Sequence, residues 1–572
     1  MKIKHLFGLA VIAAMTASCS SNEDLGTAGS GTGTNETGVG YATFTINLPT
    51  TSGTRADGDP TFADGDANEY DVFNATLLVF EKPTTATSEG EYTFVEHVDL
   101  GSMQPWKDPS ETGVTTQAKI TAKLSHVDKS GKNFALVLLN NGSGTDAKVT
   151  LPSKGDTFSA WNAATNANAT FTDTKKGFYM ANAPLYNTTD KSVTTLVAID
   201  KNKIFPTEAQ ASSGEAAADI YVERGLAKVT LTTATNYGEV GGSYVGDKVE
   251  ISNWALDVTN KKTFPIHNVD GLNKDYPDIW NNDPTTAAPS TQRFVDNSKA
   301  TAKRVYWGTD PNYKETNLFE ETKESKDARE ENFTYIKKEK LTAKPKDPLY
   351  CLENTFNLKN MMQGQTTRVI FKASYTPKDF TPADGNTFYK VGTSVALWSQ
   401  KNLEAHIKAA VSKVFSVTTD DITIKLDADG NNITTAGNHV ITAANFTVKG
   451  HDTVKTEEEQ AVNDKVGLTK DAGISTYANG ESYYIARIKH FGDALTPWNS
   501  GESYGDNNLK YLGRYGMLRN NWYVLNVQSV SGPGYPDVPD VKPNTPDDED
   551  DKYIKVSVKI LKWAKRSQDV NL

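Results

Sequence analysis

The stretch that most constrains how this chain can fold is residues 552–572, which read KYIKVSVKILKWAKRSQDVNL. Apolar and polar residues alternate strictly through its first half, with Ile554, Val556, Val558 and Ile560 separated by Lys555, Ser557 and Lys559. A period of two residues places one set on each face of a β-strand, so the pattern predicts a strand with one buried face. Leu561 and Trp563 continue on the opposite face, and we expect the strand to bulge there or to be covered on both sides.

The segment ahead of this strand, residues 536–551, is rich in proline and aspartate. Such a composition favours an extended, solvated chain, so we expect a tether here. A strand on a tether either folds back as an edge strand or is donated to another molecule. We expect donation.

The N-terminal residues predict export and lipidation. Lys2 and Lys4 precede an apolar run, and small residues then lead to Cys19. This order is typical of a bacterial lipoprotein signal peptide over residues 1–18, with Cys19 as the acylated residue; an ordinary secretory signal is the alternative. Cys351 is the one other cysteine. We therefore expect no intrachain disulfide and a buried, hydrophobic role for Cys351.

Length and charge narrow the class of protein. The 572 residues correspond to two to four domains, and a net charge of −11 argues against nucleic acid as a partner. Apart from the signal segment, the sequence holds no apolar run long enough to cross a bilayer. We expect a body that a lipid holds at the outer membrane.

A glycine- and serine-rich linker, residues 20–40, leads to a predicted strand at 41–48, with Phe44, Ile46 and Leu48 on one face. Arg55 follows in a loop, and the sequence holds no other lysine or arginine between Lys4 and Lys82. A protease specific for arginine, or one like trypsin, would find one preferred bond here, between Arg55 and Ala56. The cut would release the lipid anchor and the 41–48 strand together. An incidental surface arginine is the alternative interpretation.

The body reads as all-β with few short helices. Short apolar runs separated by turn signals, such as residues 71–80 and 133–140, predict a β-sandwich over 56–220. A second sandwich with insertions is expected over 221–535, beginning with the alternating run 221–231. The clearest helical spacing lies at 402–413, where Leu403, Ile407, Ala410 and Val411 share one face.

Several stretches, taken in their order along the chain, resemble the fimbrillin (type V pilin) family of the Bacteroidales, in particular the shaft subunits of its short-fimbria branch. They are Cys19, the pair Arg55–Ala56, and residues 222–224, 350–355, 484–491, 514–523 and 560–572. The resemblance spans residues 19–572, with poorly matched insertions at 268–348 and 420–480. The sequence departs from it at Lys562, where the family leads us to expect a proline, so the strand can bend differently there.

This resemblance implies two tandem transthyretin-like Greek-key sandwiches after a lipid-anchored propeptide, residues 19–55, which a surface protease removes. It further implies a structural fimbrial subunit that polymerises by donor-strand exchange and supports adhesion. The expected donor residues are Ile554, Val556, Val558, Ile560, Leu561 and Trp563, in a strand within 552–572. Copies of the chain, anchor and tip subunits, and the maturation protease are the expected partners.

Other classes have weaker support in the sequence. It contains no HExxH and no Gly-x-Ser-x-Gly motif, and the Asp-rich turn at 427–431 lacks the glycine and glutamate of a calcium loop. We therefore expect no enzyme, no metal and no cofactor. A surface-anchored glycan-binding lipoprotein is the main alternative, with tryptophans as sugar platforms; an anchor or tip fimbrial subunit is the other. The candidate platforms are Trp106, Trp161, Trp254, Trp307, Trp398 and Trp498.

Overall fold

The computed structural model describes most of the chain between residues 32 and 563. The described residues are 32–47, 62–63, 69, 71–103, 117–128, 130–164, 166–167, 171, 176–187, 189–190, 192–231, 236–237, 240–275, 294–295, 302–313, 318, 320–469, 471–491, 495–499, 501–502, 504, 509–548 and 554–563. Only the backbone is described for 62–63, 117, 166–167, 236–237, 273, 302–303 and 554–563.

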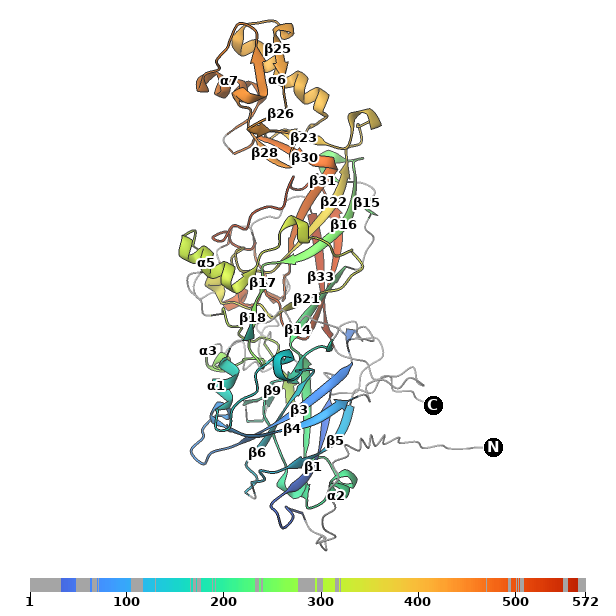
Figure 1. Ribbon diagram of the computed structural model, residues 1–572, viewed down its shortest axis with the longest axis vertical. Coiled ribbons are helices and arrows are strands. Elements are labelled where there is room, and N and C mark those ends of the chain that lie inside the picture. The colour runs from blue at the N-terminus through green and yellow to red at the C-terminus, as the bar shows by residue number, and fades with distance from the viewer. Residues whose placement is uncertain are drawn as a thin grey trace, which may run out of the picture.

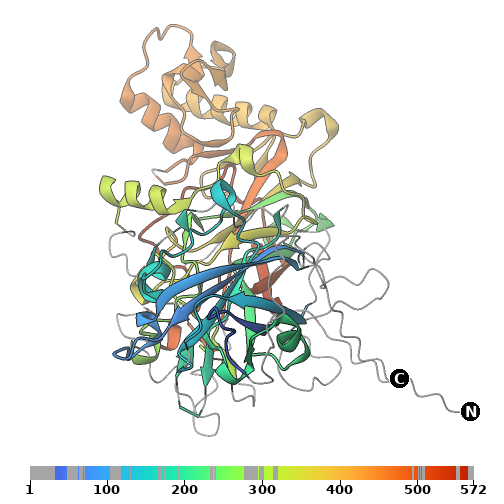
Figure 2. The ribbon, with the colours of Figure 1, turned by 60° about the horizontal axis from the view of Figure 1, so that its bottom comes forward.

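The molecule is elongated, with a first domain at one end, a second in the middle and a small module at the other end (Figure 1). Figure 2, in which the first domain comes forward, shows its blue and teal strands in front and the orange module behind. The structure is mostly β, with several sheets and few helices, as the sequence predicted.

The first domain is built on a sheet that has nine strands within the described residues, in the order β12-β1-β13-β8-β6-β3-β4, with β5 beside β1 and β11 beside β6. Its strands are β1 (Gly40–Asn47), β3 (Val72–Glu81), β4 (Thr93–Met103), β5 (Gln117–Leu124), β6 (Asn133–Leu139), β8 (Met180–Asn182), β11 (Val197–Ala198), β12 (Ile204–Phe205) and β13 (Ala218–Arg224). Side chains from β1, β3 and β6 share one hydrophobic core.

The second domain is a two-sheet sandwich. In the described part of the chain, one sheet has the order β2-β33-β32-β14-β21 and the other β15-β16-β22-β31. A common core joins residues of both sheets, among them Tyr523 of β32 and Phe371 of β22. Its strands are β2 (Phe62–Ala63), β14 (Leu226–Leu231), β15 (Asn236–Tyr237), β16 (Lys248–Asp257), β21 (Leu349–Leu352), β22 (Arg368–Thr376), β31 (Glu481–Arg487), β32 (Asn521–Val530) and β33 (Ile554–Trp563).

The run at 221–231, which was expected to begin the second domain, forms two strands that belong to two different sheets. Its first part belongs to β13 in the sheet of the first domain, and its second part is β14 in the sheet of the second. Gly225 separates the two strands, so the predicted boundary at residue 220 falls inside β13. Local alternation is the same on both sides of the glycine and cannot reveal the change of sheet.

The insertion predicted at 420–480 is part of a larger module with its own core, formed by residues 388–480. Helix α6 (Gln400–Phe415) packs against α7 (Thr456–Val466), and α6 buries Leu403, Ile407, Ala410 and Val411, which confirms the predicted helix face. The strands of the module are β23 (Phe388–Val391), β24 (Leu397–Trp398), β25 (Ile422–Ile424), β26 (Asp427–Ala428), β27 (Asn431–Asn432), β28 (Gly437–His439), β29 (Phe446–Val448) and β30 (Ile474–Tyr477).

Shorter elements cover the flanks of the first two domains. The helices are α1 (Phe158–Ala163), α2 (Glu208–Ser213), α3 (Leu272–Asp275) and α5 (Lys323–Asn332). The remaining strands are β7 (Asn166–Ala167), β9 (Leu185–Asn187), β10 (Val193–Thr194), β17 (Thr259–Asn260), β18 (Lys262–Thr263), β19 (Ala302–Arg304) and β20 (Phe333–Thr334).

Candidate strand-exchange site

Strand β1 lies inside the sheet of the first domain rather than at its edge. All eight of its residues pair with β5 in antiparallel fashion. On its other side, Tyr41 and Ala42 pair with β12, and residues 44–47 run parallel to β13. The strand that the sequence predicts at 41–48 is therefore held by neighbouring strands on both sides.

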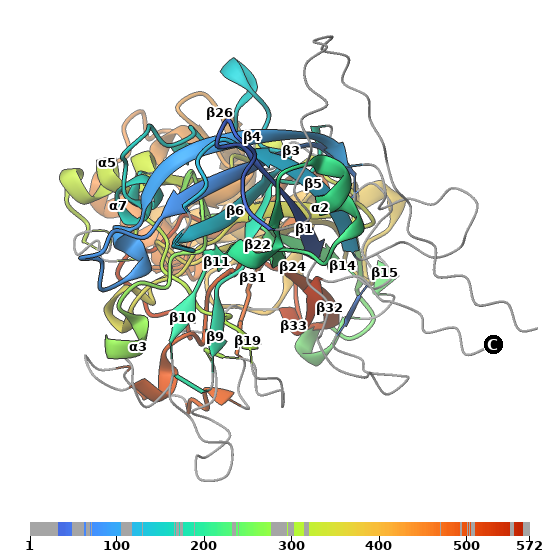
Figure 3. The ribbon, with the colours of Figure 1, turned by 90° about the horizontal axis from the view of Figure 1, so that it is seen from below.

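Both faces of β1 are covered. Ala42, Phe44 and Ile46 have no exposed surface and belong to the core of the first domain. On the other face, Thr43 is 1% exposed, and its hydroxyl donates a hydrogen bond of 2.9 Å to the carbonyl of Ala211 in α2. Helix α2 packs on β1 and β5 at this place (Figure 3). Losing β1 would open the core on one face and expose the underside of α2 on the other.

The residues predicted for lipidation and cleavage, Cys19, Arg55 and Ala56, lie outside the described residues, as does Leu48. Phe44 and Ile46 are described and occupy the buried face that the sequence predicted for them. Arg55 follows the end of β1 in the sequence, so a cut there would separate β1 from every later strand.

The C-terminal strand, β33, is folded back on its own chain. Its backbone runs antiparallel to β32 from Val530↔Ile554 to Asn521↔Lys562. On the outer side, within the described residues, β33 pairs with β2 at Phe62↔Lys562 and Ala63↔Trp563. In the single chain, β33 is thus the long outer strand of its sheet, and a short piece of chain from beyond Arg55 meets its far end.

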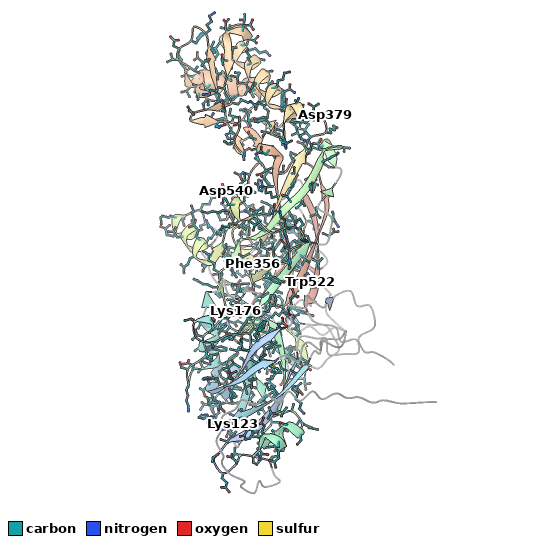
Figure 4. All side chains as sticks on the ribbon, turned by 45° about the vertical axis from the view of Figure 1, so that its right-hand side comes forward. Lys123, Lys176, Phe356, Asp379, Trp522 and Asp540 are labelled. Carbon is teal, nitrogen blue, oxygen red and sulfur yellow. The ribbon has the colours of Figure 1, made fainter. Side chains whose placement is uncertain are left out.

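The predicted tether, residues 536–551, is described up to Asp548, and this part lies against the second domain instead of being solvated. Tyr535 pairs with Tyr483, Gln363 donates a 2.9 Å hydrogen bond to the carbonyl of Thr545, and Arg368 donates to the carbonyl of Pro539. Pro543 packs on Gly364, where a Cβ atom would lie only 2.7 Å from the Cα of Pro543. Figure 4 shows Asp540 of this segment on the second domain. Proline and aspartate keep the segment extended, but its partners are protein groups rather than water.

Two carboxylates end this docked segment. Asp548 accepts hydrogen bonds from Nε and Nη2 of Arg514, each 2.8 Å, and from the hydroxyls of Tyr504 and Tyr515. Asp547 is 2% exposed and accepts a 2.5 Å hydrogen bond from Thr366. Burial, together with the two aspartates, raises the pKa of Tyr504 and Tyr515, so both hydroxyls stay protonated and able to donate. This aspartate clasp, formed by Asp547 and Asp548 with these partners, fixes the point from which β33 departs.

Buried ion pairs link the first two domains. Lys228 on β14 lies 2.6 Å from the carboxylate of Glu69, and neither side chain is more than 1% exposed. Tyr350 donates a 2.8 Å hydrogen bond to the same carboxylate. The ammonium of Lys228 also lies 3.9 Å from the centre of the Trp522 ring, which Figure 4 marks on β32. Glu69 follows Arg55 in the sequence, so this contact would survive a cut there.

A second buried group lies beside this one. The Nδ1 atom of His267 is 2.8 Å from Glu223, its Nε2 atom is 3.5 Å from Glu353, and Arg519 pairs with Glu353 at 3.1 Å. Burial opposes ionisation of Glu223, but His267 and Arg304 outweigh it and lower the pKa of this carboxyl. Residues 222–224 and 350–355 are two of the stretches that carry the family resemblance, but the sequence does not indicate that their carboxylates lie on the same histidine. The signal for this buried group that the sequence offers is the presence of charged residues inside predicted strands.

The aromatic and cysteine residues proposed for other roles are largely structural. Trp161, Trp254 and Trp307 are buried, and the indole nitrogens of the first two donate to the carbonyls of Thr150 and Lys344. Trp398 and Trp498 are half-buried, and Trp106 lies outside the described residues. Cys351 is a buried free cysteine whose pKa burial raises to about 12, which confirms its predicted hydrophobic role.

Among the residues that the structure describes, no group of three or more His, Cys, Asp or Glu side chains is arranged to hold a metal ion. Over the same described residues, no helix is both long and apolar enough to cross a membrane.

The described chain combines a buried first strand, β1, with a last strand, β33, that returns to a sheet of the same chain. Residues 475–569, which include β31, β32 and β33, match the family model described as "Major fimbrial subunit protein type IV, Fimbrillin, C-terminal". The chain therefore carries a fimbrillin C-terminal domain, which confirms the resemblance found in the sequence. Fimbrial subunits are surface proteins that assemble with other subunits, so the match indicates a structural rather than a catalytic protein.

Solved structures of low identity also align over most of the chain. Two come from Parabacteroides distasonis ATCC 8503, with 10% and 12% identity, TM-scores of 0.37 and 0.36, and 92% of this chain covered in each case. A third comes from Bacteroides eggerthii DSM 20697, with 12% identity, a TM-score of 0.32 and 91% coverage. The alignments cover 98%, 100% and 96% of those chains, respectively, and each is described as a "putative cell adhesion protein". No curated protein matches this chain.

Proposed function

We propose that this chain is the shaft subunit of a cell-surface fimbria that polymerises by donor-strand exchange and supports adhesion. In this proposal it is exported as an outer-membrane lipoprotein acylated at Cys19, cut between Arg55 and Ala56, and joined to the next subunit through β33. The observation that carries the proposal is the place of β1. Among the described strands of the first domain, it alone lies wholly ahead of Arg55, and it is internal to the sheet.

Removing β1 creates the acceptor for the exchange. Strand β5 loses its eight-residue antiparallel partner, and β12 and β13 lose theirs. Each lost main-chain hydrogen bond is worth about 0.5–1.5 kcal/mol, and burial of Phe44 or Ile46 about 1.5–3 kcal/mol. After a cut at Arg55 the strand is still held by these contacts. We therefore expect β1 to leave only when an incoming strand replaces it.

Strand β33 is suited to be that incoming strand. It has ten residues, an alternating pattern, and one long pairing partner within the described chain, so it can leave its sheet without breaking a sheet interior. A strand given by each subunit to the next makes a head-to-tail contact that does not close on itself, and this produces a filament. The buried pair of Lys228 and Glu69 between the first two domains supports a stiff subunit, as a shaft requires.

The proposed partners follow from this scheme. They are other copies of the chain, an anchor and a tip subunit, a maturation protease, and the outer membrane through the lipid before cleavage. The two domains would be transthyretin-like sandwiches in tandem. An anchored glycan-binding protein is less well supported, because three of its candidate platforms, Trp161, Trp254 and Trp307, are buried.

The test is Arg55→Ala in cells that display the protein. We expect the variant to accumulate at precursor size and to give no high-mass ladder on unboiled SDS gels. Lys465→Ala, which removes an exposed positive charge on α7, is the matched control and should behave as the unaltered chain. Arg55→Lys separates the proteases, because a trypsin-like enzyme would still cut it and an arginine-specific one would not. A normal ladder from Arg55→Ala would overturn the proposed maturation.

A further inference from the structure

We propose that the donor strand enters the slot of β1 in the same direction as β1, with Ser557 in the place of Thr43. This inference rests on the proposed function and adds the register, which fixes the side chain of the donor that meets each position of the slot. The residue that decides the register is Ser557.

The position of Thr43 accepts only a small side chain with a hydroxyl group. Thr43 is 1% exposed beneath α2. Its hydroxyl lies 2.9 Å from the carbonyl of Ala211 and 2.8 Å from the hydroxyl of Thr121, which in turn lies 3.0 Å from that of Ser212. Without Thr43, the carbonyl of Ala211 and the hydroxyl of Thr121 would each lose one hydrogen-bond partner.

The sequence of the donor offers one residue that fits. On the face opposite Ile554, Val556, Val558 and Ile560 stand Lys555, Ser557, Lys559, Leu561 and Trp563, and Ser557 alone is small and carries a hydroxyl. A shift of two residues in either direction would place Lys555 or Lys559 beneath α2, where an ammonium group would be buried. A shift of one residue would turn the lysines into the core. Both shifted registers cost more free energy than the replacement of one apolar core residue by another.

The remaining positions follow from this register. Val556, Val558 and Ile560 take the places of Ala42, Phe44 and Ile46, so every core position of β1 receives an apolar residue. Lys559 takes the place of Thr45, which is 7% exposed and lies between Lys119 of β5 and Asp219 of β13, so its ammonium group needs a counter-charge. Asp219 is exposed, and its carboxylate can offset the charge of Lys559.

The first residue of the donor marks the end of the slot. Ile554 coincides with Gly40, where a Cβ atom would lie 2.5 Å from Cγ2 of Ile204 on β12. The side chain of Ile204 must therefore turn aside when the donor enters. A branched side chain of this size can adopt another rotamer, whereas a lysine beneath α2 has no such remedy.

The direction follows from the neighbours of β1. In the direction of β1, the donor is antiparallel to β5 along the whole slot and to β12, and parallel to β13 over residues 44–47 alone. A reversed donor would be parallel to β5 and β12 instead. Antiparallel pairing is slightly more stable per residue, and the longest partner, β5, therefore favours the direction of β1.

Pairs of cysteines in the full chain test the register and the direction. Ser557→Cys with Thr121→Cys should give a ladder that survives boiling without reductant, because Thr121 is the partner of Thr43 across β5. Lys559→Cys with Lys119→Cys should do the same. Ser557→Cys with Lys119→Cys reports the register shifted by two, and Lys559→Cys with Lys123→Cys reports the reversed direction.

Covalent ladders from the first two pairs alone would support the inference. Ladders from the shifted or the reversed pair instead would overturn the register or the direction, but would leave donor-strand exchange intact. Polymers that form with no cross-link from any pair would overturn the choice of slot. If the unaltered chain forms no ladder before boiling, the proposed function itself fails, and this outcome is distinct from the others.

A second set of variants measures the role of Ser557 directly. Ser557→Lys should reduce the amount of polymer by about tenfold or more, because a lysine then falls beneath α2. Ser557→Thr, which restores the side chain of β1 itself, should polymerise normally. Secretion and size of the precursor serve as the folding control. Equal polymer from both variants would contradict the inference.

Discussion

Arg514 and Asp548 form a buried, two-point ion pair a few residues ahead of β33. Nε and Nη2 of Arg514 each donate a 2.8 Å hydrogen bond to the carboxylate, and neither side chain is more than 3% exposed. The described chain is thus held to the second domain up to Asp548, and β33 lies beyond the clasp. In the proposed exchange, Asp548 rather than the whole proline-rich segment sets the reach of the donor.

Removing the charge of Asp548 should loosen the clasp. Asp548→Asn leaves the guanidinium of Arg514 buried without its counter-charge, and we expect the free energy of unfolding to fall by about 3 kcal/mol. Chemical denaturation of the precursor measures it. Asp540→Asn, an exposed aspartate of the same segment, should change it by less than about 0.5 kcal/mol. Equal effects from both variants would show that the clasp contributes no more to stability than an exposed aspartate does.

Phe44 should matter to the precursor and not to the filament. Phe44→Ala empties a fully buried position, so the precursor should lose about 3–5 kcal/mol of unfolding free energy. Filaments that do form should dissociate at the same temperature as those of the unaltered chain, because in the proposed exchange β1 is no longer present in them. Phe73→Ala, at a residue that is 46% exposed, is the control for the loss of an aromatic ring. A lower melting temperature of Phe44→Ala filaments would mean that β1 stays in the polymer.

The apolar face of the donor should set the stability of the polymer. Val558→Asp places a carboxylate among the core residues that Phe44 contacts in the precursor, and burying an unpaired charge is strongly unfavourable. We expect the ladder on unboiled gels to disappear while the monomer is still secreted. Val570→Asp makes the same change beyond the end of β33 and should leave the ladder unchanged. Loss of the ladder in both variants would point to a general effect of charge in the tail.

Acid should destabilise the second domain through His490. Burial lowers the pKa of His490 to about 3, from an ordinary value of 6.5, and its Nδ1 atom lies 2.8 Å from the hydroxyl of Tyr523 on β32. The unfolded chain therefore takes up a proton below about pH 6.5 that the folded chain excludes until about pH 3. The stability from this residue is complete above pH 6.5 and falls as the pH drops through that window.

The corresponding measurement is denaturation at pH 7 and pH 5. The unaltered chain should lose about 2 kcal/mol more between these values than His490→Gln does. His97→Gln, on an exposed position of β4, should keep the pH dependence of the unaltered chain. If His490→Gln and the unaltered chain respond to acid alike, the buried imidazole is not the group that titrates.

Much of the fold could be predicted because apolar residues recur at every second position along a strand that has one buried face. The run 71–80 became β3 (Val72–Glu81), and the helical spacing of Leu403 and Ile407 became the buried face of α6. The same local pattern could not show that 221–231 passes from one sheet to another at Gly225. Nor could it show that residues 388–480 form a module with its own core, because that depends on contacts far apart in sequence.

The sequence predicted which segments form the candidate site better than it predicted which residues contact one another there. The alternation at 41–48 gave the buried face of β1, but nothing local indicated that β1 lies inside the sheet. Prolines and aspartates at 536–551 indicated a solvated tether because composition alone reports polarity. The partners of Asp547 and Asp548, among them Arg514 and Thr366, come from distant parts of the chain. Buried charge pairs of this kind need the folded structure to be seen.

The most direct test of donor-strand polymerisation compares the full chain with a chain that ends at Asp551. This truncation keeps the clasp at Asp547 and Asp548 and removes all of β33. Surface-sheared material from each is run unboiled and boiled on SDS gels. We predict a high-mass ladder from the full chain that collapses on boiling and is absent from the truncated one. A monomer band alone from both chains, or the same ladder from both, would contradict the account.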